Sequence, residues 1–283
     1  MCKLCYKQPI KQPEDSIDMN TKTIIQASLS TLLITLCLTG LARAADIQSQ
    51  AAAISIAAEQ RTLTQVMLKN YLLSGLGIRA RKADQELAGA LQQFTAQQQQ
   101  LVGFVTDAQV QQQLALMSES WKTVQQQYRQ TPNKQRFKTL YSGNEALLSQ
   151  GDVMLNKVVQ SKADDSAQPL SLLGQQELLC QQLVVIYAMT AWGVASEADL
   201  SYDAISADLL KNMALLQALP QNTAEINDQL QRLSNTLEQT LEVSKARPGA
   251  LLPALVDRSV VKAVLQLQQL RSEYLSLAGA NNA

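Results

Sequence analysis

The residues best equipped for chemistry lie in one short stretch with helical spacing, AAEQRTLTQVMLKNYLL, at residues 57–73. Arg61, Gln65 and Lys69 follow one another at intervals of four, so a helix places them on one polar ridge, which Gln60 adjoins. A guanidinium can bind a carboxylate or a similar small anion through two parallel hydrogen bonds. From the residues alone, the preferred interpretation of this ridge is a solvated helix face. Two alternatives stay open: interhelical hydrogen bonds that fix the register of a bundle, or contact with a ligand or partner.

The composition argues against an enzyme. The chain contains no histidine, which removes the commonest general base and the commonest metal ligand. Cys180 is the only cysteine after residue 46, so we expect no internal disulfide and interpret Cys180 as a small buried hydrophobe. The 24 basic residues balance the 24 acidic ones, without a basic patch of the kind that binds nucleic acid. We therefore expect no catalytic residue, metal site, cofactor or nucleic-acid partner.

The N-terminal residues have the features of a leader. Residues 19–44 combine a lysine, a long apolar run and a small-x-small cleavage site, which together predict a secretory signal peptide. We interpret residues 1–18, which are polar, as a misassigned extension before the true start. These features predict export to the periplasm. An N-terminal membrane anchor is the alternative, since the apolar run is close to the lower length limit of a membrane helix.

The rest of the chain predicts an all-α protein. Apolar residues recur at helical spacing, prolines fall between the periodic stretches, and no sustained alternation of apolar and polar residues indicates a strand. The expected helices are 47–75, 79–105, 107–130, 135–161, 168–195, 198–218, 223–245 and 254–278.

An internal repeat divides these helices into two groups of four. With a shift of 116 residues, residues 54–78 align without a gap on residues 170–194. The identical pairs there are Ser55/Ser171, Gln60/Gln176, Leu63/Leu179, Gln65/Gln181, Tyr71/Tyr187 and Gly77/Gly193. We expect two tandem antiparallel four-helix modules, at 46–163 and 168–280, placed end to end or side by side. Gly77 and Gly193 mark either helix ends or points within one very long helix.

The stretch at 57–73 resembles the motif A-G-R-Q-R-M-L-S-Q-R-M-A-K of a known family. That family is the N-terminal sensor domain of type IV pili methyl-accepting chemotaxis transducers, the PilJ/NarX-like periplasmic sensors. The matching residues in the first copy are Gln60, Arg61, Leu63, Gln65, Met67 and Lys69. The weaker second copy retains Gly174, Gln176, Leu179 and Gln181.

The resemblance implies a periplasmic four-helix sensor that passes a signal to a membrane-bound signalling protein. The family's nitrate-sensing members hold the anion with arginines of the first helix, at a dimer interface. Only Arg61 occupies such a position here, because Val66 stands at the second one and Glu177 at the position equivalent to Arg61. Nitrate is therefore not the expected ligand.

The sequence as a whole predicts an exported sensor-like module. The expected ligand is a small anion, and the expected partner is a membrane-bound signalling protein. The ligand would contact Gln60, Arg61, Gln65 and Lys69, with Gln176 and Gln181 as weaker equivalents. A homodimer is compatible with this interpretation. The alternative is a structural or adaptor bundle that binds another protein without a small ligand.

Overall fold

The computed structural model describes residues 47–197, 200–245 and 252–281. This part of the chain is all-α, as predicted, and contains no strand. Its helices are α2 (Gln50–Gly75), α3 (Ala80–Phe104), α4 (Ala108–Tyr128), α5 (Lys134–Ser161), α6 (Ala167–Trp192), α7 (Tyr202–Gln217), α8 (Ala224–Lys245) and α9 (Leu252–Asn281), with a 3-10 turn η1 (Ala195–Glu197). The predicted extension at 1–18 and signal peptide at 19–44 lie outside the described residues. Within the described ranges, no helix is both long and apolar enough to cross a membrane.

Side-chain caps set the starts of several helices. Ser49 accepts a hydrogen bond from the Ala52 amide, so α2 begins at residue 50 rather than at the predicted 47. Asp107 and Asn133 cap α4 and α5 in the same way, close to the breaks that the sequence indicated. Ser201 caps α7, and the helix expected from 198 begins at Tyr202.

A glycine with a positive φ angle lies at the end of the first helix in each predicted repeat. Gly77 and Gly193 have φ angles of 70° and 73°, a left-handed conformation that glycine adopts without steric cost. The Ile78 amide bonds Leu73 O at 2.9 Å, and the Val194 amide bonds Met189 O at 3.0 Å. Both helices thus close with the same Schellman-type pattern at positions 116 residues apart. This excludes the alternative of one very long helix in each repeat.

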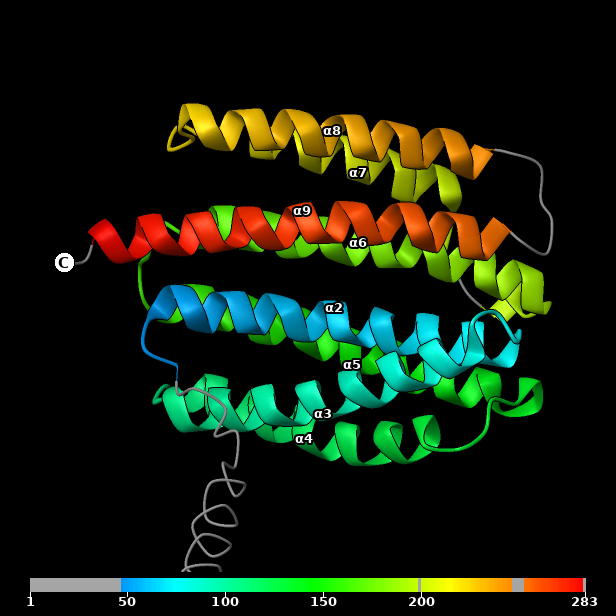
Figure 1. The fold of residues 1–283 in the computed structure, drawn as a ribbon. Helices are drawn as coiled ribbons and strands as arrows, with labels where there is room; N and C mark the ends of the chain where they lie inside the picture. The colour runs from blue at the N-terminus through cyan, green and yellow to red at the C-terminus, as the bar shows by residue number, and fades with distance from the viewer. Residues whose placement is uncertain (1–46, 198–199, 246–251, 282–283) are drawn as a thin grey trace, which may run out of the picture. The chain divides into compact units, whose positions relative to one another are not determined.

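The helices form two four-membered rings of packing neighbours. In the first ring α2 contacts α3 and α5, and α4 joins those two; in the second, α6 contacts α7 and α9, and α8 joins those two. The rings lie side by side through α2 and α6, with an additional contact between α2 and α9 (Figure 1). All these helices belong to one compact unit that spans Ala44–Ala283. Their division into two duplicated modules stays a prediction.

The close approach of α2 and α6 depends on small residues. The two helices run in the same direction (Figure 1), and Gly174 on α6 lies against Ala58 on α2. A Cβ atom added at Gly174 would stand 2.5 Å from Ala58 Cβ. The Thr62 hydroxyl also donates to Gly174 O at 3.4 Å. Ala58 and Gly174 are 116 residues apart, so the two predicted repeats meet at equivalent positions.

Their central position buries α2 and α6 on almost every side. Buried residues occur around the whole circumference of both helices, whereas α8 has one apolar stripe and one polar face. A helix that is buried on all sides is enclosed by the core. A buried polar side chain on α2 or α6 therefore needs a partner within the protein.

The α2–α6 contact makes a prediction about stability. Gly174→Ala should lower the free energy of unfolding by about 1–3 kcal/mol, because the added methyl group overpacks the contact with Ala58. Gly89→Ala is the matched control, since the space beside Gly89 on α3 is open. It should raise stability by about 0.5–1 kcal/mol through helix propensity. Urea unfolding measures both changes, and an equal effect of the two substitutions would contradict the close contact.

Candidate functional site

The four predicted ridge residues are buried, so the interpretation as a solvated face is wrong. Gln60 and Gln65 are 0% exposed, Arg61 8% and Lys69 4%. The physical reason is that α2 has neighbours on all sides: α3, α5, α6 and α9. We call these four residues, together with Gln176, Glu177 and Gln181 of α6, the polar core. Every member is less than a tenth exposed.

Arg61 joins three helices. Its Nε lies 2.5 Å from Asp152 Oδ1 on α5, and its Nη2 donates to Gln175 Oε1 on α6 at 2.8 Å. Gly151 makes room for it, because a Cβ there would lie 3.0 Å from Arg61 Cγ. The Asp152 side chain is 47% exposed, whereas that of Arg61 is 10% exposed. A buried guanidinium thus has a counter-ion that solvent reaches.

Gln60 and Gln176 occupy equivalent positions and have equivalent partners. Gln60 Nε2 donates to Phe94 O and to Gln98 Oε1 on α3. Gln176 Nε2 donates to Leu209 O on α7, and its Oε1 accepts from Asn212 at 2.6 Å. In each ring this glutamine fastens the first helix to the second. This agrees with the alternative of interhelical hydrogen bonds that set the register.

Gln65 and Gln181 both have a buried side-chain oxygen that accepts no hydrogen bond in the described structure. Gln65 Nε2 donates to Glu145 Oε1 on α5 at 3.3 Å. Burial raises the pKa of Glu145, while hydrogen bonds from Gln65 and Asn144 act in the opposite direction. In the described structure, the two unpaired Oε1 atoms therefore carry a desolvation cost.

Lys69 binds the second ring through Asp257 of α9. Lys69 Nζ lies 3.1 Å from Asp257 Oδ1, and Arg79 pairs with the other oxygen of the same carboxylate. Burial lowers the pKa of Lys69 to about 8; Glu86 raises it, and Arg79 and Lys82 lower it further. Arg79 has a φ of 47°, a strained conformation for a residue with a side chain. The turn between α2 and α3 is therefore fixed to α9.

Glu177 also forms a buried ion pair. Its charges are reversed relative to the Arg61–Asp152 pair, because here the acidic member lies on the first helix of the ring. Glu177 stands at the position equivalent to Arg61 and pairs with Arg271 of α9. Burial raises the pKa of Glu177, although the Arg271 guanidinium opposes this. In both rings, then, this position of the first helix pairs with the fourth helix, but the charge is positive in one ring and negative in the other.

The ion-pair partners of the polar core were not identified from the sequence. They are Asp152, Asp257 and Arg271. The available signal was a charge at a core-facing position of the α9 pattern, where Asp257 and Arg271 are 1% and 8% exposed. The helix pattern alone does not show which helices become neighbours. No group of three or more acidic or cysteine residues in the described ranges could hold a metal ion.

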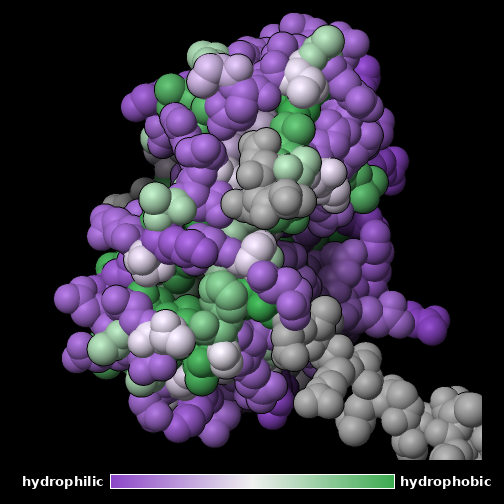
Figure 2. Space-filling model, turned by 90° about the vertical axis from the view of Figure 1, so that its left-hand side faces the viewer, coloured by the Kyte–Doolittle hydropathy of each residue, from purple (hydrophilic) through white to green (hydrophobic). Residues whose placement is uncertain are grey.

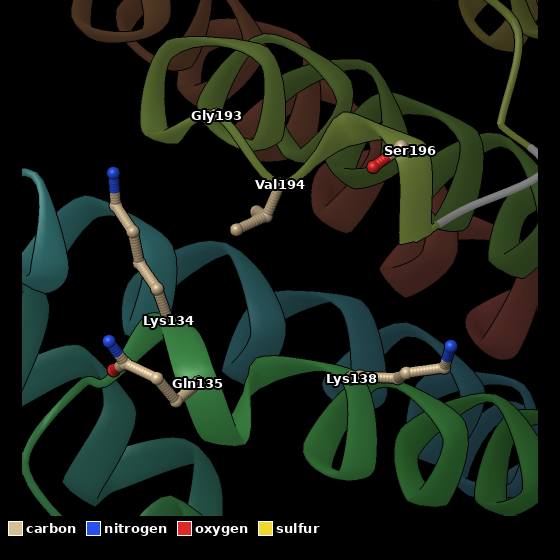
Figure 3. A pocket seen from close by; sticks show the side chains of 6 residues that line it. All are labelled: Lys134, Gln135, Lys138, Gly193, Val194 and Ser196. Atoms are coloured by element: carbon tan, nitrogen blue, oxygen red, sulfur yellow. The ribbon is translucent and has the colours of Figure 1, made fainter.

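A separate basic groove lies where the two rings meet near the end of α6. Its volume is about 380 Å³, and its lining residues are Lys134, Gln135, Lys138, Gly193, Val194 and Ser196 (Figure 3). Lys134 and Lys138 are one helical turn apart on α5, and the Lys134 side chain extends toward Gly193 (Figure 3). This groove offers positive charge at the surface, at a place distinct from the polar core.

Comparison with protein families, with curated proteins and with solved structures finds no match to this chain.

The Lys69–Asp257 pair predicts an unequal effect of removing its two members. Asp257→Leu leaves both Lys69 and Arg79 without their carboxylate, whereas Lys69→Met leaves Asp257 paired with Arg79. Breaking a buried pair costs roughly 3–5 kcal/mol when a charge is stranded. Asp257→Leu should therefore be clearly more destabilising than Lys69→Met in urea unfolding. The reverse order would contradict the shared carboxylate.

Lys69 also predicts a pH dependence. Its pKa is about 8 in the folded chain and 10.5 in a model peptide, so the unfolded state binds more protons between these values. The contribution of Lys69 to the free energy of unfolding should therefore rise from about pH 8 to about pH 10.5. Comparing wild type with Lys69→Met at each pH isolates this contribution. A difference that stays constant across the window would contradict the lowered pKa.

Proposed function

We propose that this chain is an exported, non-catalytic sensor-like module that binds a small anion at Arg61 and acts on a membrane-bound signalling partner. The observation that carries the proposal is the unequal exposure of the Arg61–Asp152 pair. A guanidinium buried among three helices keeps its charge and its forked geometry. A soluble carboxylate or similar anion competes for it with a side chain that solvent already reaches.

Exchange of the counter-ion gives a mechanism. In the free state Asp152 fastens α5 to α2 through Arg61, and Gln175 connects Arg61 to α6. An anion that takes the place of the Asp152 carboxylate releases α5 while it leaves the α6 contact in place. Such a ligand shifts the population toward a second helix packing, and it does so only by its differential affinity for the two packings.

The pairing of α2 with α6 supports the sensor interpretation. Both helices carry a copy of the motif that resembles the chemotaxis-transducer sensors, and they run in parallel with Ala58 against Gly174. The first helices of the two predicted repeats thus meet within one chain, where the sensors that this chain resembles bring two subunits together. On this proposal the second repeat is a scaffold, since Glu177 replaces the arginine there.

A specific observation also favours the adaptor alternative. Large apolar side chains between 37% and 62% exposed occur on α3, α4, α5, α7 and α9, and most of them lie on α7 and α9: Leu210, Leu215, Leu255, Val261 and Leu265. Figure 2, by contrast, shows a mainly hydrophilic end of the molecule, with hydrophobic residues scattered between. Exposed apolar side chains of this size suit contact with a protein partner or a second copy of this chain.

A thermal-shift titration with small carboxylates and inorganic oxyanions tests the proposal. At a concentration about a hundredfold above Kd, a native-state ligand adds about 2.7 kcal/mol to stability. For a chain of this size the melting temperature should rise by roughly 5–10 °C. Arg61→Ala should abolish the rise, and Asp152→Asn should shift the titration to lower ligand concentration because the competing charge is gone.

Lys134→Ala is the matched control for the basic groove of Figure 3. A rise that survives Arg61→Ala and disappears in Lys134→Ala would place the anion in that groove and contradict the proposed site. No rise with any anion, in wild type and in Asp152→Asn alike, would favour the adaptor function.

A further inference from the structure

A groove runs between α7 and α8, away from the polar core. Its volume is about 410 Å³, and its lining residues are Tyr202, Asp203, Ser206, Leu210, Glu238, Leu241 and Glu242. Leucine side chains and a phenol ring provide an apolar surface, and three carboxylates lie at the rim. None of the lining residues is basic.

The corresponding seam in the first ring is filled by a tryptophan. Trp121 of α4 packs on Phe94 of α3, with their ring centroids 4.3 Å apart. Its indole Nε1 donates to Thr95 Oγ1 at 3.1 Å, and Gln125 Nε2 donates to the same oxygen at 3.2 Å. Trp121 is 6% exposed and Phe94 is 0% exposed, so a ring and two hydrogen bonds close this seam.

The residues of the two seams can be matched one by one, because each helix of the first ring corresponds to one of the second. Helices α4 and α8 correspond with the same shift of 116 residues, which places Leu237 at the position of Trp121 and Leu241 at that of Gln125. Helices α3 and α7 correspond with a shift one residue shorter. Under that shift the buried residues Ala90, Phe94, Gln97, Gln98 and Leu101 fall on the buried residues Ile205, Leu209, Asn212, Met213 and Leu216. The hydrogen bonds of Gln60 to Phe94 O and of Gln176 to Leu209 O agree with it.

Two lining residues of the groove stand where a hydrogen-bonded pair stands in the first ring: Leu210 at the position of Thr95 and Leu241 at that of Gln125. Leu237, at the position of Trp121, is buried, is not among the lining residues and has no indole to extend toward Leu210. Leu210 is 50% exposed. Ser206 stands at the position of Leu91, and its Oγ is buried without a hydrogen-bond partner in the described structure. The aromatic ring in this seam is that of Tyr202, whose hydroxyl donates to Leu241 O at 3.1 Å, and the same lining offers the unsatisfied hydroxyl of Ser206.

We infer that the α7–α8 groove binds a small aromatic amine. The ring packs between Leu210 and Leu241 and beside Tyr202; in the first ring the residue equivalent to Leu210 is Thr95, which Trp121 contacts. The ammonium group lies at the rim, near Asp203 and Glu238, both of which are exposed. The same carboxylates repel an aromatic acid. This ligand is opposite in charge to the one proposed at Arg61 and binds at a different place, so the two proposals stand or fall separately.

Titration calorimetry of the purified protein with tryptamine tests the inference. Indole-3-propionate carries the same ring with a negative charge, and butylamine carries the same charge without a ring. Tryptamine should bind at least tenfold more tightly than either compound, because only tryptamine satisfies both the apolar surface and the rim. Equal binding of tryptamine and indole-3-propionate, or no binding of tryptamine, would overturn the inference.

Two variants copy residues from the first ring into the groove. Leu237→Trp introduces the residue found at Trp121 and should abolish tryptamine binding by filling the groove. Glu238→Lys introduces the residue found at Lys122, on the exposed face of α8, and should weaken binding at least tenfold without disturbing the fold. Glu225→Lys, in the first turn of α8 and outside the lining, is the charge-matched control and should bind as wild type does. Unchanged affinity in Glu238→Lys would contradict the role of the rim even if Leu237→Trp failed to fold.

Discussion

The structure depends on one constraint: α2 and α6 lie against each other at Ala58 and Gly174 and are surrounded by other helices. Water does not solvate the buried polar side chains of these helices, so each of those needs a partner within the protein. Arg61 has Asp152 and Gln175, and Lys69 has Asp257. The spacing of the 57–73 motif suggests a solvated ridge. In the structure its polar residues instead make contacts that connect the two rings, from Arg61 to Gln175 and from Lys69 to Asp257.

The two rings share their helix ends and one interhelical hydrogen bond, and they differ in the charges of a buried ion pair. Gly77 and Gly193 end the first helices in the same conformation, and Gln60 and Gln176 make the same kind of bond to the second helices. The ion pair at the next position is reversed in charge, with Arg61 in one ring and Glu177 in the other. The shared contacts carry stability and register, and the two proposals place ligand binding where the rings differ, at the Arg61–Asp152 pair and in the α7–α8 groove.

Much of the fold follows from the sequence because helices have local signals. The glycine ends, the caps at Asp107 and Asn133 and the apolar periodicity place most helix boundaries within a few residues. The burial of the motif does not follow from local signals, because it arises from helices that are distant in the chain. Asp152 and Asp257 become partners of Arg61 and Lys69 only once α5 and α9 have packed against α2. Spacing within one helix shows which residues share a face but not what covers that face.

Native-state hydrogen exchange tests most directly whether the central contact couples the two rings. If the buried pairs and the α2–α6 contact join them into one cooperative unit, the slowest amides of α4 and α8 should open with the same free energy, equal to that of global unfolding. A ligand at Arg61 would then affect both rings. If the slowest amides of α8 open at a much lower free energy than those of α4, the second ring unfolds independently, and the account of a coupling core is wrong.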